Sequence, residues 1–153
     1  MLISVLLGLP LGIAMAVNKE GPVDRIGTVY ILIINAIPSA IYYLILQIYI
    51  TGIFKLPILF SEDNIYSWIL PLISMSLGGI ASYAMWMRRY MIDEMNKNYV
   101  QLARSKGLGK MQVMIKHILR YAFVPMAQYL PSVILVTIAG SIYIESLYSI
   151  PGM

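Results

Sequence analysis

The feature that most constrains this sequence is the absence of charge over long stretches. Four runs, roughly 2–17, 26–52, 65–87 and 122–144, contain no Asp, Glu, Lys, Arg or His. A helix of about 20 mostly apolar residues crosses the ~30 Å hydrocarbon core of a bilayer. The chain is 59% hydrophobic and only 12% charged, which is more apolar than a soluble core of this size could bury. We therefore predict an all-α fold, a polytopic transmembrane helical bundle with about four spans.

The second run is too long for one straight buried helix. Its uncharged stretch, 26–54, would reach about 43 Å at ~1.5 Å per residue. Pro38 lies near the middle and predicts a kink, because proline removes a backbone donor and clashes with the preceding turn. Polar groups within a span more often make ordinary interhelical hydrogen bonds than line a path.

Small residues recur at four-residue spacing on two of the runs. This spacing places them on one helix face and allows close approach of a second helix. We predict close-packing stripes at Gly8, Gly12 and Ala16, and at Ser74, Gly78 and Ser82 with Gly79 and Ala81 beside them.

Positive charge gathers in the segment 88–120. Short loops rich in Lys and Arg stay on the cytoplasmic side of a membrane. The segment therefore predicts a cytoplasmic loop, and 18–25, two crossings earlier, faces the same side. It holds eight of the eleven Lys and Arg residues: Arg88, Arg89, Lys97, Arg104, Lys106, Lys110, Lys116 and Arg120.

Within this loop, two short helices are predicted on either side of a glycine breaker. The first, 99–106, is too short to be stable alone, so we expect it to dock on a partner through apolar residues framed by Arg104 and Lys106. Gly107 can end it in the left-handed conformation. The second begins at Lys110 and places five apolar residues on one face: Met111, Met114, Ile115, Ile118 and Ala122. A surface helix resting on anionic lipid is the alternative interpretation.

The loop resembles the cytoplasmic coupling loop of ABC importer permeases, in the branch that imports dipeptides, oligopeptides and, in some members, nickel. The departures from that pattern, Asn98, Ser105, Lys116 and Tyr121, leave its spacing unchanged. The matching residues are Tyr99, Val100, Ala103, Arg104, Lys106, Gly107, Leu108, His117, Leu119, Arg120, Ala122 and Pro125.

This resemblance implies a permease subunit in the cell (cytoplasmic or inner) membrane. Expected partners are two ATP-binding subunits, a second permease subunit, an extracytoplasmic solute-binding protein and the lipid bilayer, with no nucleic acid. ATP and Mg would bind to the partner subunits, and this chain would hold no cofactor and would not be an enzyme. The family has helices before and after this stretch, so we expect truncation at both ends. The coupling residues implied are Tyr99, Val100, Leu102, Ala103, Arg104, Lys106, Gly107, Leu108, His117, Arg120 and Pro125, with Leu102 and Ala103 facing the ATPase.

Two further sets of residues match the family outside the loop. Asn35, Pro38 and Ser39 fall near its translocation path. Gly140, Ser141, Glu145, Pro151 and Gly152 match a pattern at the outer face, where Glu145 either belongs to a gate or reaches from the interface into water.

Several chemistries are excluded or disfavoured by what the chain lacks. Without Cys, it has no disulfide or thiolate site, and it has no nucleotide-binding G-x-x-x-x-G-K-[ST] motif. The adjacent acids Glu62 and Asp63 are expected to be solvated. No ionisable residue lies well inside a predicted span, so proton or sodium coupling has no visible machinery. A secondary transporter or channel fragment with a lipid-binding basic loop is the alternative function.

Overall fold

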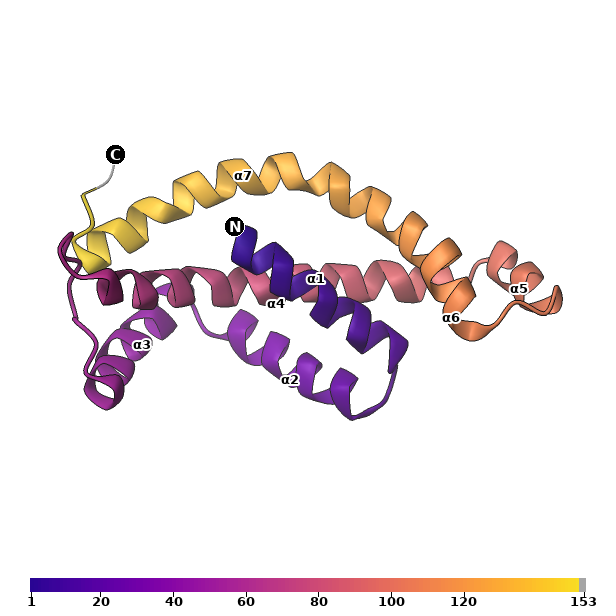
Figure 1. Cartoon of the computed structure of the whole chain (residues 1–153), viewed down its shortest axis with the longest axis horizontal. Coiled ribbons are helices and arrows are strands. Elements are labelled where there is room, and N and C mark those ends of the chain that lie inside the picture. The colour runs from indigo at the N-terminus through magenta and orange to yellow at the C-terminus, as the bar shows by residue number, and fades with distance from the viewer. Residues whose placement is uncertain (152–153) are drawn as a thin grey trace.

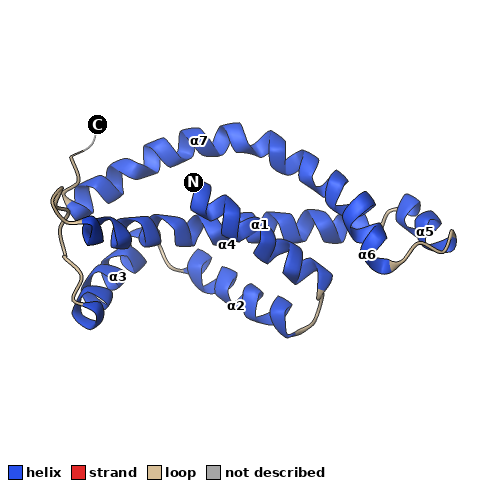
Figure 2. Cartoon of the chain, viewed as in Figure 1, coloured by secondary structure: helices blue, strands red, loops and turns tan. Residues whose placement is uncertain are grey.

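The computed structural model describes residues 1–151, except for the side chains of Leu130, Val136, Ala139, Gly140 and Ser141. Within that part of the chain every regular element is helical (Figure 2). The elements are α1 (Leu2–Val17), α2 (Pro22–Ala36), α3 (Ser39–Phe54), the 3-10 turn η1 (Ile65–Trp68), α4 (Ile69–Met95), α5 (Asn98–Ser105), α6 (Lys110–Val113), the π-helical segment η2 (Met114–Leu119) and α7 (Arg120–Tyr148).

Helix α4 is the axis of the fold. Helix α1 lies against it, α7 arches along its length, and α5 projects beyond one end (Figure 1). The small residues of α1 make the close contact possible. A Cβ added at Gly8 would lie 2.7 Å from the Cβ of Tyr83, and one at Gly12 would lie 2.6 Å from the carbonyl oxygen of Ala84. The close-packing stripe predicted on α1 is confirmed.

The kink predicted at Pro38 is a complete break. Helices α2 and α3 meet at 104°, so 26–52 is not one continuous helix. Ile37 is extended, with φ −97° and ψ 126°, because a following proline disfavours the helical conformation of the residue before it. The pair has the length and composition of one broken span or of a re-entrant loop.

Helix length and composition identify membrane-crossing candidates in the described part of the chain. The helical stretch 65–95 is the only single one there that is long and apolar enough. The bent pair α2 and α3 gives a second if it counts as one span, and α1 is apolar but shorter. The four spans predicted from the sequence therefore stay a prediction.

The largest buried cluster lies at the end of α4 that bears α5. Side chains from several elements meet there, which ties the short helices after α4 to the long ones. Its buried members are Ala16, Tyr83, Met87, Met91, Val100, Ala103, Val113, Met114, Ile118, Ala122 and Met126.

Candidate functional site: the α5 loop and the central cavity

The α5 loop, defined here as residues 98–109, ends its helix as the sequence predicts. Gly107 has a φ of +80°, a left-handed conformation that glycine adopts without steric penalty. Its N–H donates to the carbonyl of Arg104 at 2.9 Å, and the N–H of Leu108 donates to the carbonyl of Ala103 at 3.3 Å. These two bonds form a Schellman motif, which satisfies the last carbonyls of the helix.

The inner face of α5 packs on its own chain. Val100 is fully buried and Ala103 is 6% exposed, both within the cluster that contains Met91 and Met114. The expectation that Ala103 faces a partner is therefore wrong for this structure. Residues three apart share a helix face, so burying Val100 turns Ala103 inward as well.

The outer face of α5 is exposed. Leu102 is 57% exposed, and Arg104, Lys106 and Leu108 are exposed around it. Leu102 lies about 200° around the helix from Val100, at ~3.6 residues per turn. It is the apolar residue of α5 that a docking protein can reach.

Tyr99 links α5 to both long helices. Its hydroxyl donates to the carboxylate of Glu94 near the end of α4, and its ring lies 5.2 Å from the ring of Tyr121 near the start of α7. Burial raises the pKa of Tyr99, and the hydrogen bond to Glu94 raises that pKa further. The phenol therefore stays protonated and keeps donating at physiological pH.

The second short helix does not present the predicted five-residue face. Met114, Ile118 and Ala122 are buried, whereas Met111 and Ile115 are more than half exposed. The π-helical segment η2 explains the difference. Its i→i+5 hydrogen bonds turn the chain through a smaller angle per residue than an α-helix does, so the residues after Met114 are rotated away from the positions that α-helical spacing predicts. Of the coupling residues in this part, His117 and Pro125 are half-buried and Arg120 is exposed.

An ion pair that the sequence analysis missed ties the first turn of α2 to α4. Arg88 donates from Nε to Asp24 Oδ1 at 2.5 Å and from a terminal nitrogen to Oδ2 at 2.8 Å. Oδ2 also accepts the N–H of Glu20 at 2.9 Å. The shared cytoplasmic assignment of 18–25 and 88–120 was the signal that could have paired these residues, which lie 64 positions apart.

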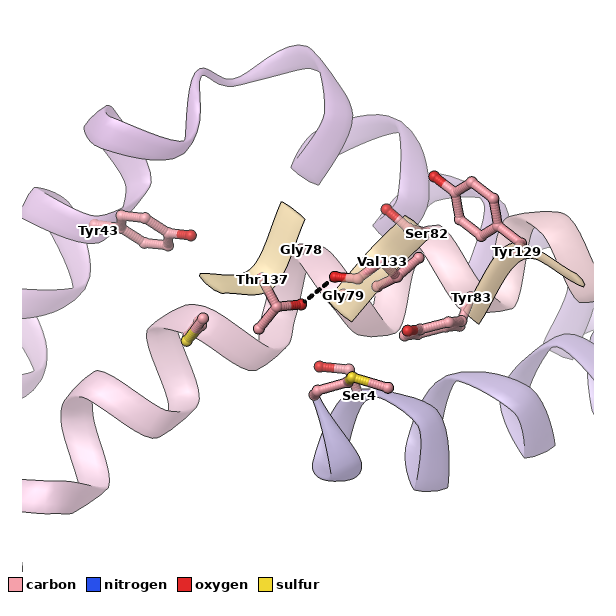
Figure 3. A pocket seen from close by; sticks show the side chains of 11 residues that line it. Ser4, Tyr43, Gly78, Gly79, Ser82, Tyr83, Tyr129, Val133 and Thr137 are labelled. Carbon is pink, nitrogen blue, oxygen red and sulfur yellow. Dashed lines mark hydrogen bonds between the residues drawn. The ribbon is translucent and has the colours of Figure 1, made fainter. Parts of the chain in front are cut away.

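A cavity of about 270 Å³ lies between α1, α3, α4 and α7 (Figure 3). Gly78 and Ser82, predicted to belong to a close-packing stripe, line it, and Gly78 also closely approaches α3, where an added Cβ would lie 2.8 Å from the hydroxyl oxygen of Tyr42. Gly79 also lines it and meets α1, where an added Cβ would lie 2.6 Å from the Cβ of Ser4. The described lining residues include no acidic or basic side chain: they are Met1, Ser4, Tyr43, Met75, Gly78, Gly79, Ser82, Tyr83, Tyr129, Val133 and Thr137.

The remaining predicted residues that the structure describes do not line this cavity. Asn35, Pro38 and Ser39 are exposed at the break between α2 and α3, and their pathway role stays a prediction. Of the gate residues, Glu145 is half-buried near the end of α7 and Pro151 is exposed. Gly152 and the side chains of Gly140 and Ser141 lie outside the described residues. Glu62 and Asp63 are exposed, as expected.

Comparison with known families gives the site its context. Residues 8–153 match the family described as binding-protein-dependent transport system inner membrane component. The chain belongs to this family. The matched region includes the α5 loop and nearly all of the cavity wall.

Relatives of this chain are named as peptide permeases. The chain is 34% identical over 150 residues to the oligopeptide transport system permease protein AmiC of Streptococcus pneumoniae, which covers 96% of the chain and 30% of AmiC. It is 28% identical over 152 residues to the dipeptide transport system permease protein DppB of Bacillus subtilis, covering 99% of the chain and 49% of DppB. A stretch of 85 residues is 36% identical to the oligopeptide transport system permease protein OppB of Escherichia coli, 56% of the chain and 28% of OppB.

The chain thus spans half or less of the length of these curated relatives. Their names describe permeases and not enzymes. The resemblance to the peptide-importing branch of ABC permeases, first indicated by the loop residues, is confirmed at the level of the family.

Proposed function

We propose that this chain is part of a permease subunit of an ATP-driven importer for peptides or related small solutes. It would lie in the cell membrane as a multi-pass bundle, with spans near 2–17, 26–52, 65–87 and 122–144. ATP and Mg would act on two partner subunits, and a second permease subunit and an external solute-binding protein would complete the assembly. The peptide specificity is inferred from the names of the relatives.

The observation that carries this proposal is the division of α5 into two faces. Val100 and Ala103 are buried in the cluster that also holds residues of α4, α6 and η2, while Leu102 is exposed on the other side. An ATPase that moves Leu102 would move the whole helix, because Val100 and Ala103 hold the other face in the buried cluster. Buried side chains and the Tyr99 contacts would then carry the displacement into α4 and α7.

The chemistry of the described residues also favours external energy coupling. No acidic or basic side chain lines the central cavity in that part of the chain. The ion pair Asp24–Arg88 is satisfied within the chain, so neither group is free to relay an ion. A mechanical input at α5 fits this arrangement better than proton or sodium coupling.

Reconstitution tests the proposal. The full-length permease pair, two ATP-binding subunits and the solute-binding protein are placed in vesicles, and entry of radiolabelled trialanine is followed with ATP present, absent, or replaced by a non-hydrolysable analogue. We expect uptake only with hydrolysable ATP, and the same rate after the ion gradients are dissipated. Uptake that needs an ion gradient and ignores ATP would support a secondary transporter instead.

A further inference from the structure

The central cavity lies midway along the axial helix of the fold. Its α4 residues run from Met75 to Tyr83, within a helix that spans Ile69–Met95. The α5 loop projects from one end of α4 and α3 lies toward the other (Figure 1). A volume of about 270 Å³ equals roughly nine waters at ~30 Å³ each. A group of several atoms therefore fits, well away from both ends of the molecule.

Tyr83 supplies a hydroxyl that makes no hydrogen bond to the described residues. The residue is 3% exposed, and its phenolic oxygen is buried without a hydrogen bond in the part of the chain that the structure describes. Figure 3 shows its hydroxyl end directed toward the space between Ser4 and Thr137. Leaving a buried hydroxyl unpaired is costly, so the wall is built to receive a hydrogen-bonding group.

Neighbouring hydroxyls complement Tyr83. Ser4 Oγ donates to the carbonyl of Ser76 at 3.3 Å, and Thr137 Oγ1 donates to the carbonyl of Val133 at 2.7 Å. Their protons are used within the chain, but each oxygen keeps lone pairs that can accept. Tyr83 can still donate. The wall therefore offers both a donor and acceptors, which are the complements of a peptide unit with one C=O and one N–H.

The charge of the cavity wall further restricts which chemical groups can bind. None of its described lining side chains is acidic or basic. A charged group placed there would lose its hydration and meet no oppositely charged side chain of the described wall. Neutral amides are favoured over termini or ionised side chains.

We propose that this cavity is a binding subsite for an uncharged peptide segment, with the Tyr83 hydroxyl donating to a peptide carbonyl. The assignment rests on the proposed function, since it gives the imported solute a place inside the permease. The proposal adds the chemical class of group that the cavity binds, a neutral amide, and the residue that binds it, Tyr83.

A single-cysteine probe tests occupancy of the cavity. This chain has no native Cys, so Ser82→Cys in the assembled complex gives one reactive thiol on the wall, with any cysteine elsewhere in the complex replaced by Ser. Modification by methyl methanethiosulfonate is timed with and without trialanine. At a peptide concentration ten times the Kd, about a tenfold slowing is expected. Ser61→Cys, on an exposed loop, is the matched control and should react equally fast in both conditions.

The outcomes separate the two proposals. If the thiol of the Ser82→Cys variant reacts at the same rate with and without trialanine, or reacts in no state of the complex, the subsite is overturned. ATP-driven uptake without protection would also overturn the subsite while supporting the proposed function. Protection without ATP-driven uptake would support the subsite and overturn the proposed function.

A second variant tests the role of Tyr83 itself. Tyr83→Phe keeps the ring in the core and removes the hydroxyl. The KM for trialanine uptake should rise about three- to tenfold, the loss of one neutral hydrogen bond, with the maximal rate and the yield of complex retained. Tyr66→Phe, an exposed phenol on η1, should change neither parameter. A lower maximal rate or yield with an unchanged KM would show a structural role and contradict the assignment.

Discussion

Gly107 and Gly109 form a natural matched pair for testing how α5 is held. Both are exposed, and a Cβ at either would meet no atom within 4 Å. They differ in backbone conformation, because Gly107 has a φ of +80° and Gly109 a φ of −62°. Replacing each with Ala therefore isolates the conformational effect from any steric clash.

The expected changes differ in size. Ala in the left-handed region costs about 1–2 kcal/mol, which lowers the closed-to-open ratio of the helix end about 5- to 30-fold. At Gly109 two effects oppose each other: Ala restricts the unfolded chain, worth about 0.4–1 kcal/mol, but Gly109 is the N-cap of α6, where glycine is preferred over alanine. The net change at Gly109 is therefore expected to be small. Gly107→Pro is more severe, because proline fixes φ near −65° and removes the N–H that donates to Arg104.

Hydrogen exchange reports these effects directly. In Gly107→Ala the amides of residues 107 and 108, which donate to Arg104 and Ala103, should exchange about 5- to 30-fold faster than in the wild type. In Gly109→Ala the same amides should exchange at close to the wild-type rate. Equal acceleration in both variants would refute the assignment of the left-handed end to Gly107.

Three further predictions concern packing and charge. Val100→Ala should destabilise the packing of α5 by about 2 kcal/mol, because Val100 is fully buried, whereas Leu102→Ala should leave thermal stability unchanged and lower only the uptake per ATP hydrolysed. Asp24→Asn should lower the melting temperature and reduce the free energy of unfolding by about 2 kcal/mol. This loss is smaller than for a fully buried ion pair, because the Arg88 side chain keeps 30% exposure. If Asp24→Asn combined with Arg88→Met restores the stability, the unpaired charge of Arg88 is the cause. Gly12→Ala should cost about 1–3 kcal/mol by overpacking the α1 contact with α4, and an unchanged melting temperature would refute that close contact.

The sequence predicted elements wherever a local cause fixes the backbone. Gly107 ends α5 and Pro38 interrupts 26–52, because glycine and proline act through their own backbone geometry. The stripe of Gly8 and Gly12 was also predictable, since close helix contacts need small residues at regular spacing.

The features that the sequence did not predict depend on contacts between parts of the chain that are distant in sequence. Whether Ala103 faces a partner or the core depends on where α4 and η2 lie, and composition at 99–106 is the same in both cases. The π-helical segment Met114–Leu119 changes which side chains share a helix face. The prediction from the sequence assumed a regular α-helix there. The cavity joins Ser4, Tyr83 and Thr137 from distant parts of the chain, and no local pattern reveals such a convergence.

The central claim is that the outer face of α5 is held by an ATP-driven partner while its inner face belongs to this chain. Cysteine cross-linking in the assembled complex tests it most directly, with Leu102→Cys on the exposed face and Val100→Cys on the buried face. We predict that the Leu102→Cys variant cross-links to an ATP-binding subunit, that the yield differs between nucleotide-free and ATP-bound states, and that the Val100→Cys variant gives no such product. If the Leu102→Cys variant forms no cross-link to protein, or its thiol reacts with an impermeant reagent from the outer side of the membrane, the account is contradicted.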